Sequence, residues 1–357
     1  MLDLTLTDSV TVISDAAFRD NRLTSVVIPS SVTTIGYEAF AYNRLTSVTI
    51  PSSVTTIGER AFAYNQLTSV VIPDSVTTIG ENVFRYNQLT SVVIPSSVTT
   101  IGWGAFAENK LTSVTIPDSV TSIGAWAFYN NQLTSVTIPD SVTVIGDYAF
   151  YYNQLTSVTI PDSVTVISDY VFAENKLTSV TIPSSVTTIG AWAFQNNLLT
   201  SVVIPSSVTT IGYWAFAYNQ LTDVIIKNAN ATIGISAFMY NQENPSNLTI
   251  HGHDPSTAKD HANLIGYTFV ALTTNDDDGS GDESGSGDDG SGNGDESGDG
   301  DESDEGSQDS DPAIITLPAG FHKYKKTVYI SLPSPLKNKI VEELVPVNYS
   351  SVANRWN

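Results

Sequence analysis

Hydrophobic residues recur along this chain at a fixed interval of 22 residues. Leu occupies every such position from Leu23 to Leu221, and Phe forms a second column from Phe18 to Phe238. Neither a helix nor a strand produces this interval, because their side-chain patterns repeat about every 3.6 and every 2 residues. Self-similarity at an interval of about 20 to 50 residues is typical of solenoids, in which each repeat forms one coil. The pattern therefore predicts a stack of about ten to eleven coils.

One coil, residues 111–132, reads LTSVTIPDSVTSIGAWAFYNNQ and shows how the repeat is built. Leu111, Val114 and Ile116 follow an L-x-x-L-x-L spacing, which predicts a short strand with the Val and Ile on one face. Pro117 ends this strand because it lacks a backbone donor. We therefore expect one short strand per coil at this position.

The second half of the coil predicts another extended run and a turn. Val120–Ile123 is rich in β-branched residues and stops at Gly124. Ala127 and Phe128 follow, and we expect them to fill the interior where the coil turns back. One coil cannot bury these residues alone, but stacked coils place each of them in a continuous core. The sequence thus predicts a mainly β repeat solenoid.

An asparagine stands immediately before the last residue of each coil. Its amide both donates and accepts hydrogen bonds, so a buried column of Asn would satisfy backbone groups in turns that no sheet partner reaches. An identical residue in every coil meets a requirement of the coil, and we interpret the column as structural. The predicted Asn ladder comprises Asn43, Asn65, Asn87, Asn109, Asn131, Asn153, Asn175, Asn197 and Asn219.

The segments LTSVTIP and SVTTIG, with the Ala-Phe pair and the Asn, resemble the BspA-like leucine-rich-repeat family of microbial surface proteins. The resemblance implies a leucine-rich-repeat arc or rod, and a role in adhesion and in binding host or matrix proteins. Residues 248–272 look like that family's C-terminal cap: a strand, a small helix and a closing aromatic strand. Ser256 is suited to cap a short helix through Asn263. The chain lacks the cysteine that the family often carries near the Asn.

Composition divides the chain into three parts. Residues 1–272 are the predicted solenoid: 1–22 form a partial N-terminal coil, 23–242 ten coils and 243–272 the C-terminal cap. Residues 273–312 are nearly all Asp, Glu, Gly and Ser and contain 16 of the 37 acidic residues. Such a stretch cannot bury enough surface to offset its ordering entropy, which predicts a disordered acidic linker. Residues 313–357 form a short C-terminal segment that we interpret as an incomplete module, a docking segment or the start of a further domain.

Charge and composition narrow the classes of partner. The net charge of −22 comes largely from the linker, and the solenoid has no basic stripe, so nucleic acid is not an expected partner. The linker carboxylates attract calcium diffusely, but Asn293, Asp295, Ser297 and Asp304 follow an EF-hand loop only in part, which predicts weak calcium binding. The absence of cysteine excludes disulfides and thiolate metal sites.

The location of the protein has two interpretations. The chain opens on repeat-like sequence, without the basic start and apolar stretch of a signal peptide, and no stretch is long enough to span a membrane. The family resemblance favours an extracellular or cell-surface protein. The missing signal favours a cytoplasmic protein or an N-terminally truncated chain, and both alternatives stay open.

Two aromatic columns stand out among the variable positions, one just before the Ala-Phe pair and one just before the Asn. If they face solvent, they form a stripe suited to protein or glycan contact. If they pack on one another, they form stacking ladders. Glu108 and Glu174 replace Tyr in the second column, which favours exposure. The candidate ligand-facing aromatics are Tyr37, Tyr42, Tyr64, Tyr86, Trp103, Trp126, Tyr148, Tyr152, Tyr170, Trp192, Tyr213, Trp214 and Tyr218, with Tyr240 following in the second column.

Catalytic and metal chemistry have little support in this sequence. Catalysis needs unique, convergent polar groups, whereas the polar positions of the solenoid are Ser, Thr or Asn repeated in coil after coil. We predict no catalytic residue and no cofactor. His251, His253 and His261 with Asp254 contain metal-ligand types, but polar residues are expected on a cap, and no metal site is predicted.

Threonine columns offer an ice-binding alternative, because Thr arrays at strand spacing can order water. Val27, Val71 and Val93 interrupt the Ser-x-Thr pairs of the first strand, and Thr suits exposed strands on propensity alone, so this alternative is less favoured. The column in register comprises Thr33, Thr55, Thr77, Thr99 and Thr121.

The sequence thus favours a non-catalytic binding or adhesion scaffold that recognises a protein, glycan or matrix ligand through its repeat face. The main alternative is a purely structural spacer of a surface protein, and an ice-binding or enzymatic role is less favoured.

Overall fold

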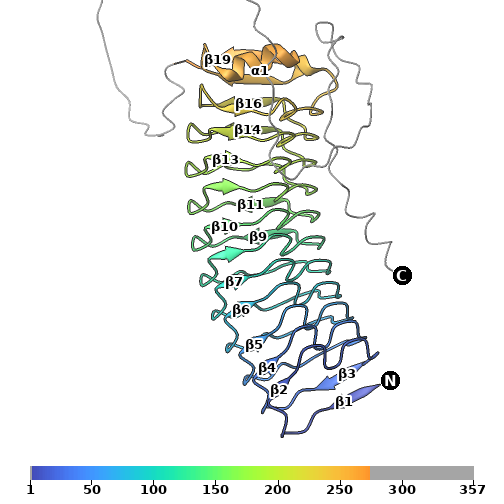
Figure 1. Cartoon of the computed structure of the whole chain (residues 1–357). Helices are drawn as coiled ribbons and strands as arrows, with labels where there is room; N and C mark the ends of the chain where they lie inside the picture. The colour runs from blue at the N-terminus through green and yellow to red at the C-terminus, as the bar shows by residue number, and fades with distance from the viewer. Residues whose placement is uncertain (1, 274–357) are drawn as a thin grey trace, which may run out of the picture. The chain divides into compact units, whose positions relative to one another are not determined.

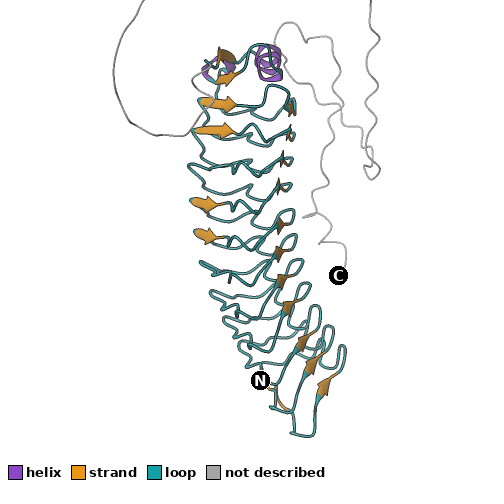
Figure 2. Cartoon of the chain, turned by 90° about the vertical axis from the view of Figure 1, so that its left-hand side faces the viewer, coloured by secondary structure: helices purple, strands orange, loops and turns teal. Residues whose placement is uncertain are grey.

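The computed structural model describes residues 2–273, which stack into a solenoid of about 12 turns, one every 22 residues (Figure 1). This confirms the predicted mainly β repeat solenoid with one small helix near its C-terminal end. The predicted linker, apart from its first residue, and segment 313–357 lie outside the described residues. Two columns of short parallel strands line opposite sides of the stack (Figure 2).

The first column contains the predicted L-x-x-V-x-I strand, but fewer coils form it than expected. Between Val27 and Thr115 it is reduced to single parallel bridges. Next to these bridges the backbone hydrogen bonds between coils range from 3.1 Å, from Thr90 N to Thr68 O, to 3.4 Å, from Thr112 N to Thr90 O. The strands of this column are β1 (Asp3–Thr5), β3 (Ser25–Val27), β9 (Ser135–Thr137), β11 (Ser157–Thr159), β14 (Ser201–Ile204) and β16 (Asp223–Ile226).

The second column is shorter in each coil but recurs in every coil. Its strands pair in parallel with partners 22 residues apart, as in Val144 with Ser122. The glycine that follows lets coils approach closely, because a Cβ on Gly124 would lie 2.7 Å from the carbonyl carbon of Gly102. The strands are β2 (Val12–Ile13), β4 (Thr34–Ile35), β5 (Thr56–Ile57), β6 (Thr78–Ile79), β7 (Thr100–Ile101), β8 (Ser122–Ile123), β10 (Val144–Ile145), β12 (Val166–Ile167), β13 (Thr188–Ile189), β15 (Thr210–Ile211) and β17 (Thr232–Ile233).

The core is a set of identical side chains stacked along the solenoid. Phe128 is fully buried between Phe106 and Phe150, with ring centroids 5.6 and 5.4 Å away. Leu111 and Ile123 are also fully buried. Each coil therefore buries its apolar residues mainly against its two neighbours, and the core runs the length of the stack.

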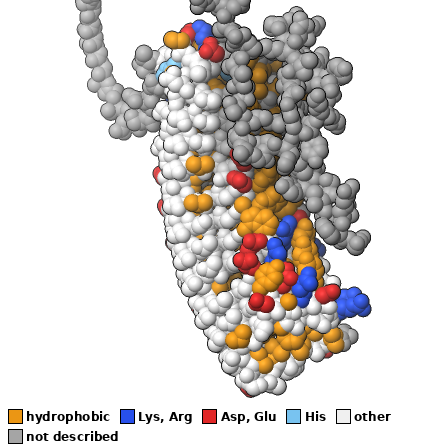
Figure 3. Space-filling model, viewed as in Figure 1, with side chains coloured by type: hydrophobic (Ala, Val, Ile, Leu, Met, Phe, Trp, Pro, Cys, Tyr) orange, Lys and Arg blue, Asp and Glu red, His pale blue; other side chains and the backbone are white. Residues whose placement is uncertain are grey.

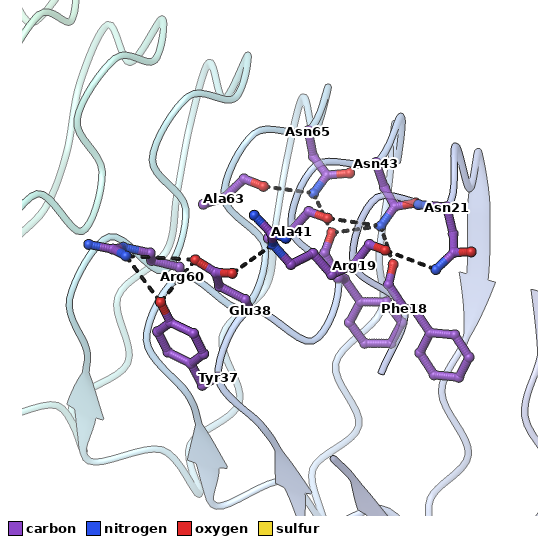
Figure 4. Close-up of polar contacts among 11 residues, drawn as sticks. Phe18, Arg19, Asn21, Tyr37, Glu38, Ala41, Asn43, Arg60, Ala63 and Asn65 are labelled. Atoms are coloured by element: carbon purple, nitrogen blue, oxygen red, sulfur yellow. Dashed lines mark hydrogen bonds and ion pairs between the residues drawn. The ribbon is translucent and has the colours of Figure 1, made fainter. Parts of the chain in front are cut away.

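The Asn column lies inside the coils and joins each coil to the one before it (Figure 4). The Asn131 amide nitrogen donates to Phe128 O of its own coil at 3.1 Å and to Phe106 O of the preceding coil at 2.9 Å. Its side-chain oxygen accepts from Leu111 N at 3.0 Å. The same bonds recur from Asn43 to Asn219. These amides thus satisfy backbone groups that lie outside both strand columns.

The C-terminal end is closed by a cap of mixed structure. A short 3-10 helix, η1 (Pro245–Asn247), leads into β18 (Thr249–Gly252), which pairs with β16 and with the closing strand β19 (Thr268–Ala271). Helix α1 (Thr257–Ile265) lies across the end of the stack (Figures 1 and 2). Ser256 caps α1 as expected, accepting from Lys259 N at 3.1 Å.

Candidate binding edge

The segment after the glycine of each coil, Ala125–Asn131 in the coil described above, forms a run of turns that we call the turn edge. Two of its residues have left-handed backbone conformations: φ is +61° at Trp126 and +50° at Asn130. The turns are closed by hydrogen bonds within the coil, such as Tyr129 N to Trp126 O at 3.0 Å. Phe128 N and Trp126 N donate to carbonyls of the next coil. In this coil, the side chains at both left-handed positions are half-buried, whereas Asn82 at the first position of its coil is buried.

The two left-handed positions hold most of the residues of the two aromatic columns. Most residues other than Gly, Asn and Asp avoid positive φ, yet Trp, Tyr and Glu stand here repeatedly. The sequence carries a signal for this conformation that hydrophobic periodicity does not reveal. Asn82 and Gly104 occupy the first column, and Asn130 and Asn196 occupy the second, which are the residue types typical of left-handed turns.

Three of the candidate aromatics do not belong to either left-handed column. Tyr37, Trp103 and Tyr213 lie one residue earlier, where the backbone has no positive φ. Their side chains are exposed, with Tyr213 at 55%. The aromatics before the Ala-Phe pair therefore occupy two adjacent positions, and only the second of these belongs to a left-handed column.

The first ladder is formed by Tyr42, Tyr64 and Tyr86. Their rings stack with centroids 4.4 and 4.6 Å apart. The guanidinium of Arg19 lies 4.9 Å from the ring of Tyr42, and that of Arg85 lies 5.0 Å from Tyr86, so a cation lies against the ring at each end. Tyr42 and Tyr64 are still 40% and 38% exposed. The rings are thus stacked on one another and open to solvent at the same time.

The second ladder runs through Trp126, Tyr148, Tyr170 and Trp192, with successive centroids 4.3, 4.4 and 4.7 Å apart. All four side chains are half-buried. Burial raises the pKa of the Tyr148 hydroxyl to about 12. Tyr129 and its neighbour in the next coil pack edge-on against this ladder.

A third cluster lies near the cap, where Tyr218 and Tyr240 stack at 4.7 Å and Trp214 stacks at 5.6 Å from Tyr240. Tyr152 stands between Asn130 and Glu174 in its own column and is 55% exposed. The tyrosine ladders of the second column are therefore interrupted where Glu and Asn replace Tyr, and over most of those coils the ladder from Trp126 to Trp192 runs in the first column instead.

Charged residues of the turn edge gather in its N-terminal half, next to the first ladder (Figure 3). Arg19 Nε lies 2.7 Å from Glu38, and Arg60 bridges Glu38 and Glu81 at 3.7 and 3.4 Å. The Tyr37 hydroxyl donates to Glu38 at 3.0 Å and accepts from Arg60 at 3.1 Å (Figure 4). The arginines are 41–46% exposed whereas the Glu38 side chain is only 12% exposed, and together these groups give the edge a polar rim.

The histidines of the cap do not converge on one point. His261 is buried and packs edge-on against Phe238, whereas His251 lies 3.5 Å from Asp223 and His253 lies 3.0 Å from Lys227 O. Asp254 instead accepts a hydrogen bond from the ammonium group of Lys259 in α1, at 2.8 Å. Within residues 2–273, no three His, Asp or Glu side chains are arranged to hold a metal ion.

The threonine column lies on the exposed side of the second strand column. The Thr121 hydroxyl donates to Thr99 O at 3.3 Å, and the same bond links Thr55 to Thr33. On the first strand column, Val71 and Val93 are 70% and 68% exposed, so apolar side chains interrupt the hydroxyl array there.

A family model, that of the BspA type leucine rich repeat region, matches residues 11–133 and 121–245 with six copies of the repeat. This chain belongs to the BspA-type leucine-rich-repeat family. Leucine-rich-repeat solenoids are generally non-catalytic interaction scaffolds, and this BspA-type chain has their architecture. In the part of the chain that the structure describes, no helix has the length and hydrophobicity to cross a bilayer.

Solved structures show the same fold. The pneumococcal vaccine antigen PcpA is 17% identical, with a TM-score of 0.56 over 76% of this chain and 79% of that one. A leucine-rich repeat protein from Bacteroides ovatus is 21% identical, with a TM-score of 0.53 over 76% and 84%. One from Eubacterium ventriosum is 27% identical, with a TM-score of 0.50 over 70% and 71%. No curated protein matches this BspA-type chain.

Proposed function

We propose that this protein is a non-catalytic, surface-associated scaffold that binds a protein, glycan or matrix ligand through its turn edge. The observation that supports this most is that residues of the aromatic columns stack on one another and are still exposed to solvent. Tyr42, Tyr64 and Tyr218 stack on neighbouring rings yet remain 38–44% exposed. Tyr and Trp held in this way are rigid, amphipathic contact groups of the kind that dominate binding surfaces.

The fold does not require these aromatics. A non-glycine residue at positive φ costs on the order of 1 kcal/mol or more, and stacking on a neighbour contributes a similar amount, about 0.5–1.5 kcal/mol. The two effects roughly cancel. Glu108, Asn130 and Asn196 adopt the same backbone conformation at the same positions without an aromatic ring. A role at the surface is the better explanation for the Trp and Tyr that remain.

A surface location is part of this proposal. The PcpA antigen is described as a vaccine antigen, and family resemblance implies microbial surface proteins. The competing function, a structural spacer, is favoured by one specific observation. The ladder from Trp126 to Trp192 stacks continuously across four coils, which would stiffen the solenoid without any ligand.

A binding screen with one triple variant separates the two functions. The full chain and a Trp126→Ser, Tyr148→Ser, Trp192→Ser variant are tested against immobilised matrix proteins, glycans and whole cells. A control variant replaces three exposed threonines of the second strand column with Ala, at residues 121, 143 and 165. Circular dichroism establishes that each variant is folded at the assay temperature.

Saturable binding that the serine variant loses and the control retains is the expected result. Binding that survives the serine substitutions would contradict the role of this ladder. A chain that binds none of the surfaces while the serine variant melts at a lower temperature would favour the structural spacer.

A further inference from the structure

Arg85 forms no ion pair with a carboxylate of the described part of the chain, unlike the other two arginines of the turn edge. Arg19 and Arg60 both pair with glutamate. The guanidinium of Arg85 lies instead 5.0 Å from the ring centroid of Tyr86 and 5.3 Å from that of Trp103, which belongs to the next coil. Two aromatic rings, which attract a cation, therefore lie against Arg85 where a carboxylate lies against the other arginines.

The guanidinium of Arg85 is held in place with part of its hydrogen-bonding capacity unused. Its Nη1 donates to the side-chain oxygen of Asn82 at 3.4 Å, and the Asn82 amide donates to Glu81 at 3.0 Å. Asn82 is only 2% exposed, so it is a fixed support. Among the described residues neither Nε nor Nη2 has a hydrogen-bond partner, and of these two nitrogens only Nε is buried. Nη2 is therefore a donor that a ligand can reach.

The first left-handed column has small residues beside Arg85, where later coils have rings. Gly104 stands in that column one coil before Trp126, with φ of +59°. A Cβ on Gly104 would overlap the side-chain oxygen of Asn82 and would lie 3.9 Å from Cδ of Arg85. The glycine therefore gives Asn82 the room to lie against the next coil and to support the guanidinium.

The charges near Arg85 favour a ligand with a single negative group. Glu81 is in the same coil and lies 3.4 Å from Arg60, and Glu108 is one coil beyond Tyr86 in the second left-handed column. Both carboxylates repel further negative charge, which disfavours densely sulfated glycans and runs of Asp or Glu. Both also accept hydrogen bonds from hydroxyl groups. A sugar residue with one carboxylate among several hydroxyls matches these groups.

We propose that Arg85 binds the carboxylate of an acidic sugar residue, a uronic or sialic acid, in a glycan ligand. The ligand carboxylate accepts from Nη2 of Arg85, which gives a charge-assisted hydrogen bond of the stronger kind. The two rings exclude water from the faces of the guanidinium and so strengthen that bond. This inference rests on the proposed function of the turn edge and names its ligand class.

The experiment compares two substitutions of Arg85 with a charge-matched control. Arg85→Gln removes the charge, and the backbone accommodates it because Gln195 occupies the same position five coils later. Arg85→Lys keeps the charge but removes the planar guanidinium. Arg44→Gln is the control, because Arg44 is exposed two coils away and Gln66 occupies its position in the next coil.

The full chain and the three variants are titrated by calorimetry with oligosaccharides that end in sialic acid or glucuronic acid, and with the same oligosaccharides without the acidic residue. Heparin and a polyglutamate peptide test for general attraction of polyanions. Circular dichroism gives the melting temperature of each variant, so that loss of binding is separated from loss of folding.

We expect the acidic oligosaccharides to bind and Arg85→Gln to weaken their binding by about tenfold or more, as the loss of a charge-assisted hydrogen bond requires. Removal of the acidic sugar should have the same effect. Arg85→Lys should also weaken binding at an unchanged melting temperature, because an ammonium group cannot present the same planar donors. Arg44→Gln should bind like the full chain.

Four results would overturn the inference: no acidic oligosaccharide bound, equal binding by the full chain and Arg85→Gln, equal losses in Arg85→Gln and Arg44→Gln, or binding of heparin or polyglutamate alone. Failure here is distinguishable from failure of the proposed function. If Arg85→Gln still binds matrix proteins or cells and the Trp126, Tyr148 and Trp192 variant does not, the scaffold function stands while the acidic-sugar site does not.

Discussion

Replacing Asn131 with Ala tests whether the Asn column holds adjacent coils together. Asn131 is buried in the middle of the stack. Its substitution removes the acceptor of Leu111 N at 3.0 Å and the donors to three carbonyls, those of Phe106, Phe128 and Tyr129. Each carbonyl keeps one partner, from the Asn109 amide, the Asn153 amide and the Glu108 backbone respectively. Only the Leu111 N–H is left buried with no partner.

The magnitude follows from that count. One orphaned buried donor costs about 1–3 kcal/mol, and three carbonyls that each lose one of two partners add a smaller amount. We expect Asn131→Ala to lower the free energy of unfolding by about 3 kcal/mol. Asn21 provides a matched control in the same column, because it is exposed and, within the described residues, its amide donates only to Arg19 O at 3.0 Å. Asn21→Ala should change stability by less than about 0.5 kcal/mol.

Urea unfolding of the full chain, followed by far-ultraviolet circular dichroism, measures both variants. Because solenoid stability is a sum over neighbouring coils, the interior substitution should also broaden or split the transition. If Asn131→Ala unfolds within about 0.5 kcal/mol of the unmodified chain, the Asn column is not a structural requirement and its interpretation as a link between coils is wrong.

Three further outcomes are expected. Phe128→Ala, in a fully buried column, should destabilise the chain by about 3–5 kcal/mol in urea unfolding, and a smaller loss would show that the stack closes over the cavity. Ser256→Ala removes the cap of α1 and should cost about 1 kcal/mol, whereas Ser256→Asp should largely retain the stability. Burial lowers the pKa of His261 to about 4 from its ordinary 6.5. As the pH falls, the unfolded state therefore binds the proton first. The free energy of unfolding should decrease by up to about 3 kcal/mol between about pH 6.5 and 4. His261→Leu should remove that part of the pH dependence of the melting temperature, and an unchanged profile would show that another group is responsible.

The sequence predicted the fold because every repeat has apolar residues at the same positions, and these must be buried. Leu111, Val114 and Phe128 recur at one interval, and only stacked coils bury all of them. The cap followed from Ser256 and the short helix pattern after it, although α1 extends two residues beyond Asn263. The extent of the first strand column was not predictable, because coils with the same L-x-x-V-x-I spacing form a strand in some places and only single bridges in others.

The candidate site was predictable only as a set of residues. The aromatic columns were visible in the sequence, but whether they stack or face solvent depends on the distance between coils, and the structure shows both at once. The hydrogen bond from the Asn196 amide to Glu174, at 2.6 Å, was not predicted, although the repeated AENK and AWAF segments were present in the sequence. Such a contact depends on which side chains from adjacent coils meet, and residues 22 positions apart meet only in the folded stack.

The sequence by itself determined the period, the core and the type of architecture, because apolar periodicity fixes which residues must be buried. Asn and Gly at the turn positions are a sequence signal for left-handed backbone, but only the tertiary structure decided that Trp126 adopts it too and that the Arg19, Glu38 and Arg60 charges connect. Backbone conformation in a turn is set by hydrogen bonds to the next coil, as in Trp126 N to Asp147 O at 2.9 Å. Such bonds exist only once neighbouring repeats are in register, and the surface that a partner meets is fixed at that stage.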